Sequence, residues 1–224
     1  MAVTTFCAIS DIHQRLDQTR RLGPVLESAH WVLLLGDLTQ FGHRREAAAV
    51  MEALRGYNSR CLAVPGNLDH PDVLAWLREQ GCCLHGESRR LGSVGLAGLG
   101  GSNPTPFGTP FELTEESITD VLGEPLRAIA AAPVRIVVSH PPPRGTAVDR
   151  IRPGLHAGSR SVRRLVEEQQ PDLLLCGHIH EAAGEDCLGR TRLINPGPLA
   201  KGGYVWVEAD EGGVRAELRY LDES

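Results

Sequence analysis

The sequence of 224 residues has no long hydrophobic run and no excess of positive charge. No apolar segment approaches the roughly 20 residues of a membrane span, and Met1 to Ser10 lacks the basic segment that opens a secretory signal. The 23 Lys and Arg residues are outnumbered by 28 Asp and Glu residues, and the net charge of −5 argues against binding to a nucleic-acid polymer. We therefore expect neither a membrane nor a nucleic-acid polymer among the partners.

Paired cysteines and two common catalytic motifs are also missing. The six cysteines are scattered, with no C-x-x-C pair and no spacing typical of a small disulfide-bonded domain. There is no GKS or GKT sequence for a P-loop and no G-x-S-x-G turn for a serine hydrolase. The cysteine pattern predicts a reducing, cytoplasmic location, and the missing motifs leave these two enzyme classes unsupported.

Short strand-like runs alternate with helical segments from the start of the chain, which predicts crossover units and a largely parallel sheet. The length suits one domain over residues 1–224. Pro141 to Gly158 is dense in Pro and Gly and predicts an irregular connection, whereas the segment from Arg192 onwards predicts antiparallel strands. Helices are expected at residues 17–29, 44–56, 72–80, 114–131 and 159–169.

Five apolar runs each end shortly before a residue that can bind a divalent metal. The residues that follow these runs are Asp11, His13, Asp37, Asn67, His140, His178 and His180. In a parallel sheet the carboxyl ends of the strands share one edge, so ligands far apart in sequence become neighbours. Zn²⁺, Mn²⁺ and Fe sites hold about four to six ligands including water, so seven protein ligands are too many for one ion. The pattern predicts two divalent metals that share one carboxylate.

A glycine stands directly before three of these residues, at Gly36, Gly66 and Gly177. We interpret each glycine as the point where the backbone turns sharply so that the next side chain faces a crowded site. Asp11 and His13 are two residues apart, as are His178 and His180. The alternation of side chains at a strand end would direct both members of each pair to the same side.

The same residues carry a resemblance to a known family. The matching motifs are Asp11-Ile12-His13, Gly36-Asp37, Gly66-Asn67-Leu68-Asp69, Ser139-His140-Pro141-Pro142 and Gly177-His178-Ile179-His180. In this order they make the chain similar to the calcineurin-like metallophosphoesterases. The resemblance implies an α/β fold, a four-layer αββα sandwich of two mixed β-sheets flanked by helices. It also implies two ligand sets that share Asp37 as the bridge, namely Asp11, His13, Asp37 and His180 for one metal and Asp37, Asn67, His140 and His178 for the other.

Such a site implies hydrolysis of a phosphoester. Two cations roughly 3.5 Å apart lower the pKa of a shared water and neutralise the phosphate while hydroxide attacks in line with the leaving oxygen. We predict catalytic roles for Asp37, Asn67, His140 and Asp69, and substrate contacts for Asn67, His140, Asn103 and His156. A ligand set without thiolate suits Mn²⁺, our first choice, as well as Fe, Zn²⁺ or Ni²⁺.

One position departs from the family's pattern. Many members have His after the Asn of the third motif, where it helps the leaving oxygen, but this chain has Leu68. An alkoxide leaving group would then depend on the metals or on another donor, so we expect weak action on alkyl monoesters and easier action on diesters or aryl esters. Asp69 and His70 are the nearest candidates to replace the missing group.

We hypothesise a metal-dependent phosphoesterase acting on a small substrate, and a phosphodiesterase rather than a monoesterase. The alternative is a non-catalytic interaction scaffold on the same fold, although the retained His13, His140, His178 and His180 favour an enzyme. A protein phosphatase is disfavoured because little chain remains to build a peptide groove. Nucleotides, cyclic nucleotides, glycerophosphodiesters and sugar phosphates stay open as substrates, as does the oligomeric state.

Overall fold

The chain forms a five-stranded and a six-stranded sheet, and the computed structural model describes residues 3–221. The five-stranded sheet has the order β13-β12-β1-β2-β3, with β1, β2 and β3 parallel and β12 antiparallel to both of its neighbours. Its strands are β1 (Thr4–Ile9), β2 (Trp31–Leu34), β3 (Cys61–Ala63), β12 (Gly203–Asp210) and β13 (Gly213–Tyr220). We call it the first sheet.

The second sheet has the order β10-β11-β9-β6-β5-β4. Its four central strands are parallel, and the edge strands β10 and β4 are antiparallel to their neighbours. Its strands are β4 (Ser88–Leu91), β5 (Val94–Leu99), β6 (Val134–Ser139), β9 (Leu173–Leu175), β10 (Gly184–Leu188) and β11 (Thr191–Asn195).

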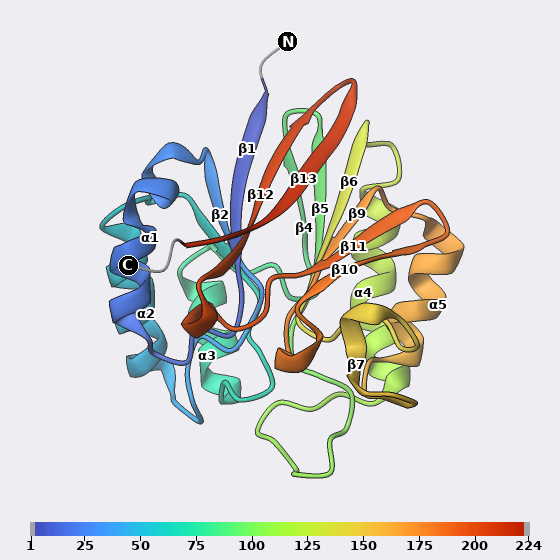
Figure 1. Cartoon of the computed structure of the whole chain (residues 1–224), viewed down its shortest axis with the longest axis horizontal. Helices are drawn as coiled ribbons and strands as arrows, with labels where there is room; N and C mark the ends of the chain where they lie inside the picture. Colours follow the sequence, from blue (N-terminus) through green and yellow to red (C-terminus); the bar gives the residue numbers. More distant parts are fainter. Residues whose placement is uncertain (1–2, 222–224) are drawn as a thin grey trace.

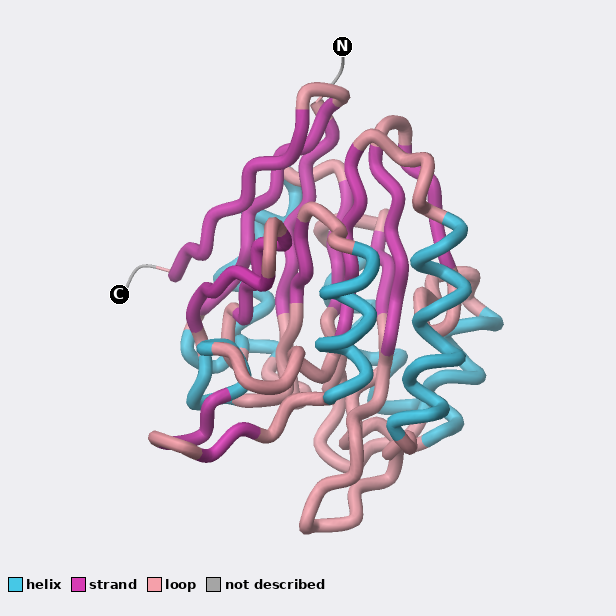
Figure 2. The backbone as a smooth tube through the Cα atoms, turned by 90° about the vertical axis from the view of Figure 1, so that its right-hand side faces the viewer, coloured by secondary structure: helices cyan, strands magenta, loops and turns pink. Residues whose placement is uncertain are grey.

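Helices cover the outer faces of both sheets (Figure 1). The helices α1 (Leu16–Ser28), α2 (Arg44–Arg55) and α3 (Pro71–Glu79) lie on the first sheet, and α4 (Glu115–Ala128) and α5 (Arg160–Gln169) lie on the second. Figure 2, turned toward that second side, shows α4 and α5 running alongside the strands. The order helix, sheet, sheet, helix confirms the predicted αββα sandwich of two mixed sheets.

The apolar core follows from the alternation of side chains along each strand. In β1, Phe6 and Ala8 belong to the cluster between the sheets, whereas Cys7 and Ile9 belong to the cluster beneath the helices of the first sheet. All four side chains are fully buried. Because both faces of the strand are covered, β1 has apolar residues in succession rather than an apolar and polar alternation.

The helix ends match the capping signals in the sequence. Thr114 Oγ1 accepts the Ser117 N–H at 3.1 Å at the start of α4, and Ser159 Oγ accepts the Val162 N–H at 3.1 Å at the start of α5. Each bond satisfies one of the backbone donors that a helix leaves free in its first turn. Both helices therefore begin one residue after the expected first residue, which serves as the N-cap.

The expected antiparallel arrangement near the C-terminus was partly wrong. β12 and β13 form a hairpin of the first sheet, but β11 lies in the second sheet and is parallel to β9. The connection expected to be irregular contains the short hairpin β7 (Arg150–Arg152) and β8 (Leu155–His156), and β10 was missed. Residue alternation identifies a strand but not its partner, and the exposed residues of β10 weaken even that pattern.

Among residues 3–221, no helix has both the length and the apolar character needed to cross a membrane. All six cysteines are free thiols, five of them buried and Cys187 exposed. Burial raises the pKa of Cys7 to about 12, so this thiol stays protonated as an ordinary core side chain.

Candidate metal centre

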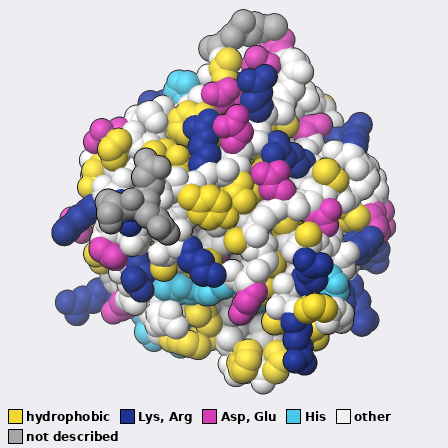
Figure 3. Space-filling model, viewed as in Figure 1, with side chains coloured by type: hydrophobic (Ala, Val, Ile, Leu, Met, Phe, Trp, Pro, Cys, Tyr) yellow, Lys and Arg dark blue, Asp and Glu magenta, His cyan; other side chains and the backbone are white. Residues whose placement is uncertain are grey.

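All seven predicted ligands follow strands at one edge of the sandwich, where the carboxyl ends of the parallel strands of both sheets lie. This edge is at the bottom in Figure 1, and Figure 3 shows histidine side chains at the surface of the lower part of the molecule. The loops after β1, β2 and β3 carry the ligands of the first sheet, and the loops after β6 and β9 carry those of the second. The crossing of two sheets therefore brings together residues up to 169 positions apart in sequence.

The first group consists of Asp11, His13 and His180, whose possible ligand atoms lie within 4.8 Å of one another. His180 Nε2 is 3.2 Å from Asp11 Oδ1 and 3.3 Å from His13 Nε2. His13 Nδ1 lies 3.3 Å from the carbonyl oxygen of Thr39. Because a carbonyl oxygen can only accept a hydrogen bond, Nδ1 carries the proton. The Nε2 lone pair of His13 is thus directed at its neighbours in the group.

The second group consists of Asp11, Asp37 and His140, again within 4.8 Å. His140 Nδ1 donates to the carbonyl of Leu35 at 2.8 Å, so its Nε2 faces the group, 3.6 Å from Asp37 Oδ1. Asn67 Oδ1 is 3.0 Å from the same Nε2. The ring of His178 lies beside that of His140, with ring centroids 5.1 Å apart.

Asp11 is the carboxylate common to both groups, whereas the resemblance assigns the shared position to Asp37. Asp37 Oδ1 accepts the N–H of Leu68 at 2.9 Å and faces His140, which turns this carboxylate toward the second group. Asp11 lies between the groups, and its carboxylate also accepts the N–H of His178 at 3.2 Å. Asp11 thus belongs to both groups of neighbouring ligand atoms, and the assignment of the bridge to Asp37 stays a prediction.

Four of the predicted ligands have a left-handed backbone. The φ angles are 52° for Asp11, 47° for His13, 48° for Asp37 and 69° for His178. Left-handed conformations are uncommon for residues other than glycine and cost on the order of 1–3 kcal/mol in strained cases. The shared direction of Asp11 and His13 therefore comes from sharp left-handed bends beyond the end of β1, and the strand alternation that we proposed is not its cause.

The three glycines before ligands provide space for the neighbouring side chains. A Cβ on Gly66 would lie 2.0 Å from Asp37 Oδ1, and one on Gly177 would lie 1.8 Å from Ser10 Oγ and 2.6 Å from Asp11 Oδ2. A Cβ on Gly36 would lie 2.2 Å from His140 Nδ1, and Gly36 also has a φ of 105°. Only Gly36 needs the conformational freedom that we predicted for all three, and the other two are required because the site is so closely packed.

The electrostatics of the centre separate the carboxylates from the imidazoles. Burial, together with the charges of Asp11 and Asp69, raises the pKa of Asp37 well above its usual range. Burial opposes ionisation of Asp11, but the hydrogen bond from His180 and the nearby His140 lower its pKa. Burial lowers the pKa of His140 and lowers that of His178 to about 3. The site thus combines crowded carboxylates with imidazoles whose pKa is lowered by burial at His13, His140 and His178, whereas the hydrogen bond to Asp11 raises the pKa of His180.

This donor set fits divalent cations. The Nε2 atom of His140 and Oδ1 of Asn67 are both acceptors in this arrangement, yet they are 3.0 Å apart. His180 differs, because its Nε2 donates to Asp11 and this hydrogen bond raises the pKa of His180. A cation between such acceptors would satisfy both, and metals bind imidazole in the neutral form that burial maintains here.

Asp69, predicted as catalytic, has a different set of partners. Its carboxylate accepts the N–H groups of Gly66, Leu38 and Thr39 and the hydroxyl of Thr39, at 2.7 to 3.1 Å. It is fully buried and ties the loop after β2 to the loop after β3. This geometry favours a role in holding the loops of Asp37 and Asn67 over direct contact with substrate.

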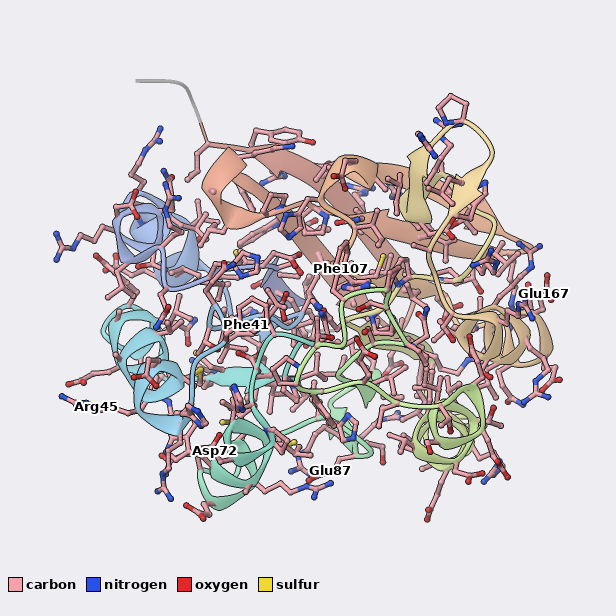
Figure 4. All side chains as sticks on the ribbon, turned by 90° about the horizontal axis from the view of Figure 1, so that it is seen from below. Phe41, Arg45, Asp72, Glu87, Phe107 and Glu167 are labelled. Carbon is pink, nitrogen blue, oxygen red and sulfur yellow. The ribbon has the colours of Figure 1, made fainter. Side chains whose placement is uncertain are left out.

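The predicted substrate contacts Asn103 and His156 lie on two loops of the same edge. Asn103 Nδ2 donates to the carbonyl of Ala157 at 3.1 Å and so joins these loops, while His156 Nδ1 is 2.7 Å from Asp149 Oδ1. The loop of Asn103 also reaches the centre, because the Phe111 N–H donates to the carbonyl of Asn67 at 3.1 Å. Figure 4, seen from below, shows the labelled Phe107 of this loop projecting at the same edge as Phe41, which follows β2.

Sequence reasoning missed the groups that orient the ligands. The carbonyls of Leu35 and Thr39 fix the rings of His140 and His13, and backbone carbonyls have no sequence signal. Asn195 Nδ2 donates to the carbonyl of Ile179 at 3.0 Å, between the last two histidines. The Pro and Gly residues of Asn195-Pro196-Gly197-Pro198 are the signal in the sequence for a turn at this point.

Comparison with known proteins places the chain in a family. The calcineurin-like phosphoesterase family model matches residues 4–182. The chain belongs to this family, which confirms the resemblance in its motifs. An uncharacterized protein of Methanocaldococcus jannaschii is 32% identical over 194 residues, which cover 85% of this chain and 86% of that protein.

Solved structures share the fold at low identity. A Thermus thermophilus protein has a TM-score of 0.71 at 20% identity and covers 99% of this chain and 100% of its own. A dimetal phosphatase from Danio rerio has a TM-score of 0.62 at 14% identity, with coverage of 98% and 99%. The anchor in the inner membrane complex of Plasmodium has a TM-score of 0.71 at 12% identity, with coverage of 100% and 86%. These likenesses show the fold, which several functions can share.

Proposed function

We propose that this phosphoesterase-family chain is a dinuclear metal-dependent phosphodiesterase acting on a small substrate. The observation that carries the proposal is the gathering of Asp11, Asp37 and His140 from both sheets, with their possible ligand atoms within 4.8 Å of one another. Buried carboxylates without a cation destabilise a fold, as the raised pKa of Asp37 indicates. A bound pair of divalent ions would explain why these residues are buried together.

The residues divide into ligands and the groups that position them. One ion would be held by Asp11, His13 and His180, and the other by Asp37, Asn67, His140 and His178, with Asp11 or Asp37 shared. When bound, such ions supply hydroxide near neutral pH and neutralise the charge of the phosphate. The carbonyls of Leu35 and Thr39 hold two of the imidazoles with Nε2 facing inward.

The preference for diesters rests on Leu68 and on the engagement of Asp69. Leu68 cannot donate a proton through its side chain, and the carboxylate of Asp69 is bonded to neighbouring loops. A phosphodiester with an aryl or otherwise stable leaving group needs less help from a proton donor. Mn²⁺ is the first metal to test, followed by Fe, Zn²⁺ and Ni²⁺.

We also propose a cytoplasmic protein of one domain, without a membrane or nucleic-acid polymer as partner. The net charge of −5 and the free, mostly buried cysteines support this proposal.

The test is a panel of phosphoesters with protein reconstituted with each metal. With Mn²⁺ we expect faster turnover of bis(4-nitrophenyl) phosphate than of 4-nitrophenyl phosphate, and loss of both in Asp37→Asn. Metal binding is measured separately by titration calorimetry. A protein that binds no divalent metal and hydrolyses neither ester would refute the proposal and favour a scaffold on this fold.

A further inference from the structure

His156 is held by a buried carboxylate in the loop between β6 and α5. Its Nδ1 lies 2.7 Å from Asp149 Oδ1, and the Asp149 side chain is fully buried. Asp149 also accepts the N–H groups of Gly145, Thr146 and Gly158 at 3.1, 2.8 and 3.0 Å. Although burial opposes its ionisation, the hydrogen bonds from His156 and these N–H groups lower the pKa of Asp149. The carboxylate is therefore an acceptor with a fixed position.

This bond determines how the imidazole of His156 is presented. An ionised carboxylate can only accept, so Nδ1 of His156 carries the proton of the shared hydrogen bond. The side chain of His156 is 29% exposed, and Nε2 has no hydrogen-bond partner within residues 3–221. The hydrogen bond therefore uses Nδ1 and leaves Nε2 without a partner among the described residues, in a partly exposed side chain.

The loop of His156 is bonded to three segments of the metal centre. The Ser159 N–H donates to the carbonyl of Pro142, two residues after His140. Asn195 Nδ2 donates to the carbonyl of Val148, the residue before Asp149, at 3.4 Å. It also donates to the carbonyl of Ile179, which lies between His178 and His180, at 3.0 Å. Figure 1 shows β7 of this loop at the lower edge, near the segment after β9, and β7 packs against the 3₁₀ helix η2 (His180–Ala182).

A further hydrogen bond connects the segment of His156 with the loop that carries Asn103 and contacts Asn67. Asn103 Nδ2 donates to the carbonyl of Ala157, directly after His156, at 3.1 Å. The same loop reaches Asn67 through the Phe111 N–H. His156 thus lies in a loop on the second-sheet side of the centre, where it pairs with Arg150 of β7, the strand that packs against η2 and its first residue His180.

The centre lacks a proton donor at the position where the family resemblance leads one to expect it. Leu68 occupies that position, Asp69 is fully engaged, and His70 stacks on His43 with ring centroids 4.0 Å apart. His43 bonds to Asp72, but both side chains of that pair are well exposed, at 59% and 40%. His156 is the histidine outside the ligand set whose orientation a buried carboxylate fixes.

We propose that His156 is the proton donor to the leaving oxygen and that Asp149 is its positioning residue, a role that rests on the proposed phosphodiesterase function. As the oxygen of hydroxide bonds to phosphorus, the bond from phosphorus to the leaving oxygen breaks. The released electron pair takes the proton from Nε2 of the imidazolium. The neutral imidazole then regains a proton from solvent, and Asp149 keeps Nδ1 in place throughout.

The test measures how activity depends on the leaving group. We would determine kcat/KM with Mn²⁺ for the ethyl 4-nitrophenyl and ethyl phenyl phosphodiesters. His156→Gln should lose about 100-fold on the phenyl ester and only about threefold on the 4-nitrophenyl ester, because a good leaving group needs little protonation. Asp149→Asn should show the same pattern with a smaller loss. Equal losses on both esters, or none, would overturn the proposal.

Two further variants separate this role from loop anchoring. Gln at position 156 can still donate to Asp149, so its thermal stability should match the parent. In the His156→Gln background, Leu68→His should restore part of the phenyl-ester activity, which a damaged loop would not allow. His30→Gln is the matched control, because His30 bonds to Thr5 at the opposite edge and should leave both rates unchanged.

The two proposals fail in different ways. If the parent protein hydrolyses neither ester with any metal, the phosphodiesterase function and the role of His156 both fall. If the parent and His156→Gln hydrolyse both esters with the same ratio of rates, the enzyme stands and only the role of His156 is wrong.

Discussion

The two sheets supply different chemistry to the edge that they share. The loops of the first sheet deliver two carboxylates, an amide and one imidazole, from Asp11, Asp37, Asn67 and His13. The loops of the second sheet deliver only imidazoles, from His140, His178 and His180. The first sheet therefore supplies the acidic groups of the centre, and the second supplies imidazoles, of which His140 and His178 have a pKa lowered by burial.

Backbone strain follows the same division. Asp11, His13 and Asp37 of the first sheet have positive φ angles, and His178 is the corresponding ligand of the second. Asp69 adds a third buried carboxylate on the first side and bonds its loops together. Neither sheet therefore holds a complete site. Without cations, the strained backbone and the buried carboxylates destabilise the first sheet more than the second.

The largest expected effect comes from removing one charge of the first sheet. Asp37→Asn should lower kcat/KM by at least about 100-fold, since even the outer partners of metal ligands contribute about 10–100-fold. The same change should raise the melting temperature of the metal-free protein, because it relieves the repulsion among Asp37, Asp11 and Asp69. Calorimetry with and without a chelator measures both states. A lower melting temperature of the metal-free variant would show that repulsion among the carboxylates does not destabilise the first sheet.

The second sheet should respond in the opposite direction. His140→Ala should also abolish activity, but it should destabilise the metal-free protein by about 2–4 kcal/mol, because it opens a cavity and leaves the carbonyl of Leu35 without its donor. Urea unfolding of the metal-free protein measures this loss. If His140→Ala were as stable as the parent, the imidazoles would not be structural members of the core.

A smaller effect tests the close packing of the first-sheet loops. Gly66→Ala should cost about 1–3 kcal/mol and weaken metal binding, because the new Cβ would lie 2.0 Å from Asp37 Oδ1 and 2.1 Å from its backbone nitrogen. Gly56→Ala is the matched control, since Gly56 has a helical φ of −59° and its nearest contact is 3.4 Å away. Titration of both variants with metal measures the affinity. Equal affinities would show that a Cβ at position 66 does not displace Asp37.

The smallest effect concerns a carboxylate that stabilises the outer layer of the second sheet. Glu115 accepts the Ser159 hydroxyl and the N–H groups of Arg160 and Ser161, at 2.6, 2.9 and 2.8 Å, at the N-terminus of α5. Although burial opposes it, these bonds lower the pKa of Glu115. Glu115→Gln should cost about 1 kcal/mol at pH 7, as the loss of a helix cap does.

The stability difference between the parent and Glu115→Gln should depend on pH. A carboxylate with a lowered pKa stabilises the fold above its unfolded pKa of about 4.3 and loses this contribution as the pH falls through the folded value. The difference between parent and Glu115→Gln should therefore be constant from pH 7 to 5 and shrink below about pH 4. A difference that stays the same at pH 3 would mean that charge is not the cause.

The strands and helices could be predicted from the sequence because their local signals are strong. The apolar runs of β1, β2 and β6 and the caps Thr114 and Ser159 mark elements without reference to the rest of the chain. The sheet to which β11 belongs could not be predicted, since its partner β9 is set by the packing of the whole second sheet.

The gathering of the candidate ligands at one edge could be predicted for a related reason, but their geometry could not. A strand end followed by Asp or His is visible in the sequence, so Asp37 and His140 could be named from it. The position of Asp11 in both groups of candidate ligands and the orientation of His156 by Asp149 depend on backbone bends and loop contacts. These arise only when distant segments pack, as in the contact between Asn103 and Ala157.

The position of β1 between β2 and β12 has a consequence for folding kinetics. Its register pairs Thr4 with Ala209 on one side, while Phe6 pairs with Trp31 on the other. Contacts between such distant segments form slowly, because a long loop must close before the contacts stabilise it. The amides of β1 that bond to β12 should therefore gain protection from hydrogen exchange late in refolding, when the hairpin of β12 and β13 docks.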